Sequence, residues 1–377
     1  MEPIIVAMCS FCFLFLVYQL YKLYDQKRDQ CCYLLHYECH KPSDDRKIDT
    51  KFCGNIIARN KNLGHQDYKF LLRVIVNSGI GEETYGPRNI IERRENSPTL
   101  QDGISEMEEF FIDTLDRLFR KTGVSPREID VLVVNVALLS SAPSLTSKII
   151  NYYKMRDDVK SFNLTGMGCS GSLISINLVQ NIFKSHKNAM AIVVCSESIA
   201  PNWYSGNDKS MILTNCLFRS GGCSIMLTNN RAFENRAKLK LKCLVRTHLG
   251  ASDEAHNCCM QKEDDQGRLG FYLGKNLRKT ATLAFKKNVV GIAKKALPLR
   301  EIVRYIAVNC VWEVLRDLED GSVWRDIIDA YPVKTTANPY MEKYGWINRE
   351  KLEVDVWLIF ARYSAVLFSK TMKWEVL

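Results

Sequence analysis

Residues 159–183 read VKSFNLTGMGCSGSLISINLVQNIF, and this stretch decides the fold. Val159 to Leu164 has the pattern of a strand, and Leu173 to Phe183 is apolar at helical spacing. Glycines on both sides of Cys169 allow a sharp turn that holds the thiol out at the edge of a sheet. The helix start would offer free N–H groups and a positive dipole end, both of which favour thiolate over thiol. We therefore expect Cys169 to be a nucleophile, more reactive than an ordinary cysteine.

The same turn has two other interpretations. Gly166 to Gly171 spells G-x-G-x-x-G between a strand and a helix, the dinucleotide-binding fingerprint, and Glu197 follows at the end of the next strand. That match is weak, because the strand is only half apolar and a thiol sits inside the turn. Cys169 could also be one more buried cysteine, and the local pattern alone does not decide between these interpretations.

The flanking sequence alternates between helical and strand patterns. A helix is predicted where Ile104, Met107, Phe111, Leu115 and Leu118 recur at three and four residues, with Gly123 closing it. Glu106, Glu108 and Glu109 then fall on its solvated face. A second helix is predicted over 145–154, and further strands over 129–139, 189–195, 221–228 and 239–245. The alternation predicts an α/β fold with a mainly parallel sheet.

The composition is that of a globular protein whose cysteines are mostly reduced. The chain has 377 residues, 46% of them hydrophobic, and a formal net charge of +10, which suits an anionic substrate or a membrane surface. Its 14 cysteines are scattered through a long α/β pattern, so most read as small buried residues in a reducing compartment. The pairs Cys31-Cys32 and Cys258-Cys259 lack zinc-knuckle spacing, and we predict no metal and no other cofactor.

The N-terminus reads as a membrane segment. Residues from Pro3 to Leu23 are almost wholly apolar, long enough to span a hydrocarbon core, so we assign 1–24 as a transmembrane anchor. A cleaved signal peptide would need a basic start and a small-residue cleavage site, which are absent. The positive charges follow the segment, which places the body of the protein in the cytosol. The alternative is a buried core helix.

Longer motifs carry a specific resemblance. Asn163-Leu164-Thr165-Gly166-Met167-Gly168-Cys169-Ser170 resembles the active-site segment of plant 3-ketoacyl-CoA synthases, the condensing enzymes of very-long-chain fatty acid elongation. Further similar stretches stand in family order, at 78–85, 149–156, 202–211 and 215–222. The similarity is continuous from about Asp25 to about Arg300. It implies a thiolase-like fold of two related α/β halves in five layers, held in the endoplasmic reticulum membrane.

The resemblance also implies a mechanism. The cysteine that matches the family nucleophile, Cys169, takes the acyl group of a long-chain acyl-CoA as a thioester. Malonyl-CoA then loses carbon dioxide, and its carbanion attacks that thioester to give a 3-ketoacyl-CoA. In the family a histidine and an asparagine of the second half stabilise the developing negative charge. The partners implied are acyl-CoA, malonyl-CoA, the membrane, other elongase subunits and a homo- or hetero-dimer of synthases, with no nucleic acid.

The second half departs from this pattern. Histidine occurs only at 36, 40, 65, 186, 248 and 256, so the family's later histidine segment has no match, and its Arg-Phe-Gly-Asn segment is also missing. The chain instead passes from the middle of the family directly to stretches that resemble its C-terminal end, at 310–314 and 338–346. We therefore expect an internal deletion. The expected division is 25–300 as the nucleophile-bearing region, 301–348 as a remnant of the second half, and 349–377 as an unassigned apolar tail.

One histidine of the first half does match an active-site residue of the family. His248 lies near the end of a predicted strand, and we take it as the second candidate catalytic residue beside Cys169. A structural histidine is the alternative. His248 cannot obviously replace both missing donors.

Three functions therefore compete. The first is a member of the condensing-enzyme family that has lost part of its catalytic half and is weak or inactive in elongation. The second is a non-catalytic membrane partner or regulator of fatty acid elongation. The third, a nucleotide-dependent oxidoreductase, rests on the glycine pattern alone.

Overall fold

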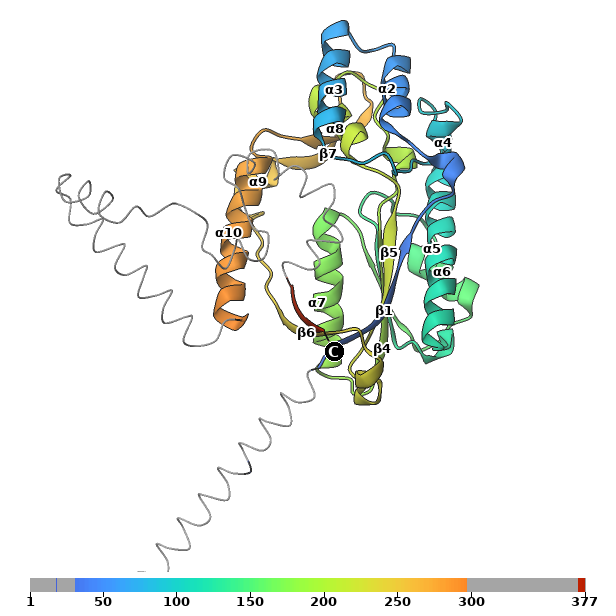
Figure 1. The fold of residues 1–377 in the computed structure, drawn as a ribbon, viewed down its shortest axis with the longest axis vertical. Helices are drawn as coiled ribbons and strands as arrows, with labels where there is room; N and C mark the ends of the chain where they lie inside the picture. Colours follow the sequence, from blue (N-terminus) through green and yellow to red (C-terminus); the bar gives the residue numbers. More distant parts are fainter. Residues whose placement is uncertain (1–17, 19–30, 297–371, 377) are drawn as a thin grey trace, which may run out of the picture.

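The computed structural model describes residue 18, residues 31–296 and residues 372–376. A seven-stranded sheet has the order β3-β2-β4-β5-β1-β6-β9, and β7 and β8 form a separate hairpin (Figure 1). The strands are β1 (Tyr33–His40), β2 (Val131–Asn135), β3 (Lys160–Leu164), β4 (Met190–Ser196), β5 (Gly222–Thr228), β6 (Leu239–Leu244), β7 (Cys259–Glu263), β8 (Leu269–Leu273) and β9 (Met372–Val376).

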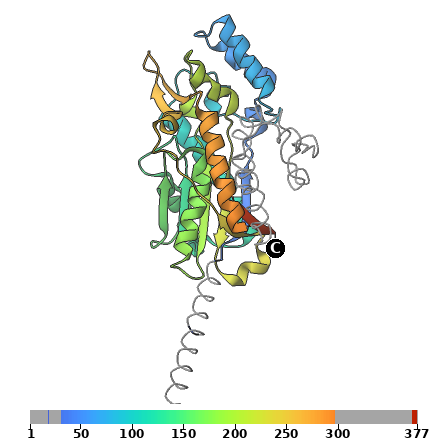
Figure 2. The same cartoon turned by 90° about the vertical axis from the view of Figure 1, so that its left-hand side faces the viewer.

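Helices flank both faces of the large sheet. They are α2 (Thr50–Arg59), α3 (His65–Asn77), α4 (Arg88–Ile91), α5 (Leu100–Thr122), α6 (Leu145–Tyr153), α7 (Gly171–Phe183), α8 (Lys209–Leu217), α9 (Asp253–His256) and α10 (Leu277–Ala296). Figure 1 shows α5 and α6 on one side of the sheet and α7 with α10 on the other, and the turned view in Figure 2 shows α10 running lengthwise along its side of the molecule.

Alternating apolar residues of the central strands fill two cores. Leu132, Val134, Ile192 and Val194 point toward the α5 side, while Val131, Val133, Ala191 and Val193 point toward the α7 side. Because successive strand residues point to opposite faces, a fully apolar run is what a sheet covered on both sides requires. The sequence predicted these two strands for that reason.

The prediction of a mainly parallel sheet is wrong. Only β2 pairs in parallel, with β3 and with β4. The pairs β4–β5, β5–β1, β1–β6 and β6–β9 are all antiparallel. The physical reason is that β5 returns antiparallel to β4, and β1 then inserts between β5 and β6 antiparallel to both, so strand direction alternates from β4 to β9.

The long helix α5 starts and stops as its sequence indicates. The Thr99 hydroxyl accepts the Asp102 N–H at 3.1 Å, and the Asp102 carboxylate accepts the Thr99 N–H at 2.8 Å, which forms a capping box. Gly123 ends the helix in the left-handed conformation, with φ 69°.

Two expected segments fall largely outside the described residues. The expected anchor at 1–24 is outside them except for Tyr18. The described part of the chain contains no helix that is long and apolar enough to cross a membrane. The expected remnant at 301–348 is also outside the described residues. Of the tail assigned to 349–377, residues 372–376 form β9, which pairs with β6 at the edge of the sheet.

Candidate active site

The turn between β3 and α7 has the geometry expected of a nucleophile elbow. Gly166 and Gly168 both have left-handed φ angles, 69° and 55°, a region that costs glycine little and other residues more. Residues Gly168–Ser170 form a 3-10 turn that runs directly into α7. Cys169 lies in this turn and is exposed to solvent. The Gly166 N–H donates to the Ala137 carbonyl at 3.1 Å, which ties the turn to the chain beyond β2.

The third glycine of the fingerprint has a packing role. A Cβ built on Gly171 would lie 1.8 Å from Oδ1 of Asn135, the last residue of β2. The first turn of α7 therefore rests against the end of β2 in a way that only glycine permits. This contact accounts for Gly171 without a bound dinucleotide.

Glu197 supplies the charge that acts on Cys169. It follows β4, and its carboxylate accepts the N–H groups of Ala137 at 3.1 Å and Leu138 at 2.8 Å. Burial raises the pKa of Glu197 to about 7. The Glu197 carboxylate thus binds the backbone that follows β2, beside the elbow. With this pKa, Glu197 loses its proton in the neutral pH range.

The reactivity expected of Cys169 stays a prediction, and the described surroundings of this residue oppose its thiolate form. Burial by the surrounding protein, and then the charge of Glu197, raise the pKa of Cys169 above its ordinary value. A backbone hydrogen bond acts in the opposite direction and is outweighed. The residue as a whole is exposed, while the protein packed around its sulfur disfavours the charged form. These surroundings oppose the thiolate that a position at a helix start favours.

The other candidate, His248, is exposed in the loop after β6. Its Nδ1 accepts the N–H of Gly250 at 3.1 Å. Among the contacts of the residues that the structure describes, none joins His248 to Cys169. The half-buried Cys259, at the start of β7, does interact electrostatically with Cys169. The described structure thus brings Glu197 and Cys259 near the elbow, and neither was taken as a site residue from the sequence.

Glu106 corrects a further expectation. It was placed on the solvated face of its helix, but it is 7% exposed. Its carboxylate accepts the N–H groups of Ile199 and Ala200, both at 2.9 Å, and the hydroxyl of Ser220 at 2.6 Å. These bonds fix the segment that follows Glu197. The spacing offered a signal for this burial, because Gly103 and Phe110 stand three and four residues from Glu106 and so share its helical face. In the structure all three residues are buried.

Comparison with known proteins identifies the family. The family described as FAE1/Type III polyketide synthase-like protein matches residues 24–313. The chain is 45% identical to 3-ketoacyl-CoA synthase 12 of Arabidopsis thaliana, over 89% of this chain and 95% of that protein. The chain belongs to the 3-ketoacyl-CoA synthase family. The match to 3-ketoacyl-CoA synthase 3 of the same plant is 42% identical, over 92% of this chain and 97% of that protein. The family is one of condensing acyltransferases that act in fatty acid elongation.

The alignment to 3-ketoacyl-CoA synthase 12 shows that this chain is shorter than its relative within the aligned range. It extends over 451 positions, more than the 377 residues of the whole chain. Part of that relative therefore has no counterpart here, and the expected place of the gap in the second half stays a prediction.

Solved structures support the fold. Tetrahydroxynaphthalene synthase from Streptomyces coelicolor matches with a TM-score of 0.60 at 16% identity, over 71% of this chain and 74% of that one. The type III polyketide synthase domain of Steely1 from Dictyostelium matches with the same score and coverage. The expected thiolase-like α/β fold is thus confirmed for the described part of the chain.

Proposed function

We propose that this synthase accepts an acyl group from a long-chain acyl-CoA on Cys169. The sulfur would attack the thioester carbonyl, a new C–S bond would form, and coenzyme A would leave as its thiol. The observation that supports this step is the exposed cysteine on a glycine-flanked turn at the start of α7. Unpaired N–H groups at a helix start favour the negative oxygen of the tetrahedral intermediate.

The second half-reaction is where we expect failure. Loss of carbon dioxide from malonyl-CoA builds negative charge on an enolate oxygen, and the family stabilises it with a histidine and an asparagine whose segments are missing from this sequence. Removing one such donor typically lowers the rate by about a hundred- to a thousandfold. We therefore propose a synthase that acylates slowly and condenses poorly on its own. Slow acylation also agrees with the raised pKa of Cys169.

We further propose that the chain is anchored in the endoplasmic reticulum membrane by residues 1–24, with its body in the cytosol. The support is the apolar run Pro3–Leu23 and the basic residues after it. Acyl-CoA and malonyl-CoA would then be its substrates at the membrane surface.

A non-catalytic role in the elongase is the second candidate. The observation that favours it is the block of the relative that has no counterpart here. Without that block, a synthase half would gain its missing donors only by pairing with another synthase subunit. In this role the chain would bind a sister subunit or acyl-CoA and regulate elongation without turning over.

A two-stage assay separates the candidates. The purified full chain is first incubated with radiolabelled long-chain acyl-CoA, and the label is mapped by peptide mass spectrometry. Cys169→Ser should abolish the label, while Cys243→Ser, which changes another free thiol of the same half, should retain it. Malonyl-CoA is then added, and carbon dioxide and 3-ketoacyl-CoA are measured.

Label on Cys169 with little product supports the proposal. Turnover comparable to that of a full-length synthase would overturn the proposed impairment. An unlabelled Cys169 would overturn the acylation step, and co-purification of a sister synthase with that unlabelled chain would establish the regulatory role.

A further inference from the structure

Three cysteines form a row across the large sheet. Cys39 on β1 faces Cys223 on β5, and Cys223 in turn faces Cys195 on β4. Facing residues of antiparallel strands point to the same side of the sheet, so the three thiols line one face. All three are free. This row lies outside the Cys169 elbow.

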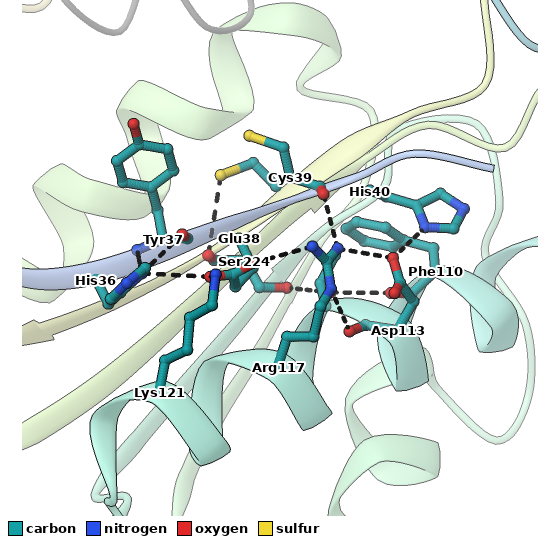
Figure 3. Close-up of polar contacts among 12 residues, drawn as sticks. His36, Tyr37, Glu38, Cys39, His40, Phe110, Asp113, Arg117, Lys121 and Ser224 are labelled. Carbon is teal, nitrogen blue, oxygen red and sulfur yellow. Dashed lines mark hydrogen bonds and ion pairs between the residues drawn. The ribbon is translucent and has the colours of Figure 1, made fainter.

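The row lies on the α7 side of the sheet. Cys195 and Cys223 pack against the cluster of apolar residues that α7 covers. Glu38, the neighbour of Cys39, points the other way, where it forms ion pairs with Arg117 at 2.9 Å and Lys121 at 2.7 Å on α5 (Figure 3). Cys39 must therefore face away from α5.

The Cys39 end of the row is the most open to solvent. Cys39 is exposed, while Cys195 and Cys223 are partly buried. Tyr37, two residues earlier on the same face, is also 45% exposed. A dissolved oxidant can therefore reach Cys39 before it reaches the other two.

The three thiols also differ in acidity. A hydrogen bond from the Cys223 thiol and the charge of Arg117 lower the pKa of Cys39 to about 7, against burial and the charge of Glu38. The hydrogen bond to Cys39 and burial raise the pKa of Cys223. Burial raises the pKa of Cys195 to about 12. Cys39 is therefore the thiol of the row that loses its proton most readily.

We propose that Cys39 and Cys223 are a peroxide-responsive thiol pair that closes a disulfide between β1 and β5. The Cys39 thiolate attacks one oxygen of hydrogen peroxide and the O–O bond breaks. That oxygen stays on Cys39 as a sulfenic acid, and the other leaves as hydroxide, which takes up a proton to become water. The Cys223 sulfur then attacks the Cys39 sulfur, a second water leaves, and an S–S bond forms.

The register fits this bond. Directly facing residues of antiparallel strands have Cα atoms about 4.5–5.5 Å apart, inside the range of about 4.4–6.8 Å that disulfides require. No backbone movement is needed to bring the two residues together. The three thiols are not arranged as a metal site, because no group of His, Cys, Asp or Glu side chains within the described residues could hold a metal ion.

The bond would affect the sheet beside the elbow. β5 pairs with β4 up to Ser196, the residue before Glu197. A bond between β1 and β5 would hold the N-terminal strand in the sheet beside this strand end. The expected effect is a higher unfolding temperature of the oxidised form than of the reduced form.

The test oxidises the purified full chain with a small molar excess of hydrogen peroxide at neutral pH. Non-reducing digestion and mass spectrometry should find a Cys39–Cys223 cross-link that a dithiol reductant removes. Cys39→Ser should slow the oxidation of Cys223 by about tenfold or more, because the thiolate is the species that peroxide attacks. Cys195→Ser, the matched control at the other end of the row, should leave the cross-link unchanged.

A second measurement needs no variant. Iodoacetamide labelling of Cys39 in the unaltered chain should reach half its maximal rate near pH 7. A midpoint near the ordinary value of 9.0, a cross-link between Cys195 and Cys223, or no cross-link at all would each overturn the proposal.

Discussion

Replacing Gly171 by alanine tests whether the elbow depends on the contact between α7 and β2. The three atoms nearest to the added Cβ all belong to Asn135, with Oδ1 at 1.8 Å, Cγ at 2.3 Å and Nδ2 at 2.5 Å. Ordinary contacts between heavy atoms lie at about 3.5–4.0 Å, so the helix or the side chain must move by more than an ångström. Asn135 is buried and has little room to move.

The expected cost follows from two opposing effects. Overpacking a core contact typically costs about 1–3 kcal/mol. Alanine in place of glycine returns at most about 1 kcal/mol through helix propensity. Because the added Cβ overlaps the Asn135 side chain deeply and that side chain is buried, we expect a net loss of about 2 kcal/mol. This loss lowers the unfolding temperature by about 2–3 °C in a chain of this size.

A second substitution isolates the cause. Asn135→Ala removes all three clashing atoms, so Gly171→Ala in that background should cost almost nothing, with a coupling energy of about 2 kcal/mol. Gly54→Ala is the matched control, because its Cβ would meet only Leu72 at 3.4 Å, and it should be neutral or stabilising. Thermal unfolding in detergent of the unaltered chain, the two single variants, their combination and the control measures these values. Additive effects of the two substitutions, within about 0.5 kcal/mol, would refute the packing argument.

The remaining predictions concern charge and membrane attachment. Glu197→Gln should shift the pH midpoint of Cys169 alkylation downward, because it removes the negative charge that raises that pKa, whereas Glu106→Gln should leave the midpoint unchanged; an unmoved midpoint in the first variant would contradict the electrostatic account. Because the pKa of Glu197 is raised from 4.5 to about 7, the folded state binds its proton more tightly than the unfolded state. The free energy of unfolding should therefore fall as pH rises from about 4.5 to 7, and Glu197→Gln should flatten that slope in pH-dependent thermal unfolding. The full chain should remain with membranes after an alkaline carbonate wash, given the apolar run Pro3–Leu23; its recovery in the soluble fraction would rule out the anchor.

Features that depend on local sequence were predictable. β2 and β4 are continuous apolar runs, and α5 has apolar residues at helical spacing between a capping box and a closing glycine. Each of these local patterns is sufficient to predict the element and its buried residues. The elbow was predictable for the same reason, since Gly166 and Gly168 adopt the left-handed angles that only their residue type tolerates easily.

Features set by distant partners were not predictable. From Leu35 to His40, β1 alternates apolar and polar residues as a half-buried strand does, but this local pattern does not say which strands it joins. Its place in the sheet depends on β5 and β6, which pair with it from about two hundred residues away. The burial of Glu106 depends likewise on N–H groups of the segment after β4, which lie about ninety residues further along the chain.

The position of the nucleophile and its activation depend on different parts of the chain. Everything that places Cys169 lies in the described first half, namely the two left-handed glycines, the bond from Gly166 to Ala137, and Gly171 against Asn135. The charge that acts on the thiol there is the carboxylate of Glu197, which opposes ionisation. A cation or a hydrogen-bond donor close to the sulfur would be needed to reverse this effect. The described residues thus fix the position of Cys169, while the charge that they place beside its sulfur opposes the thiolate.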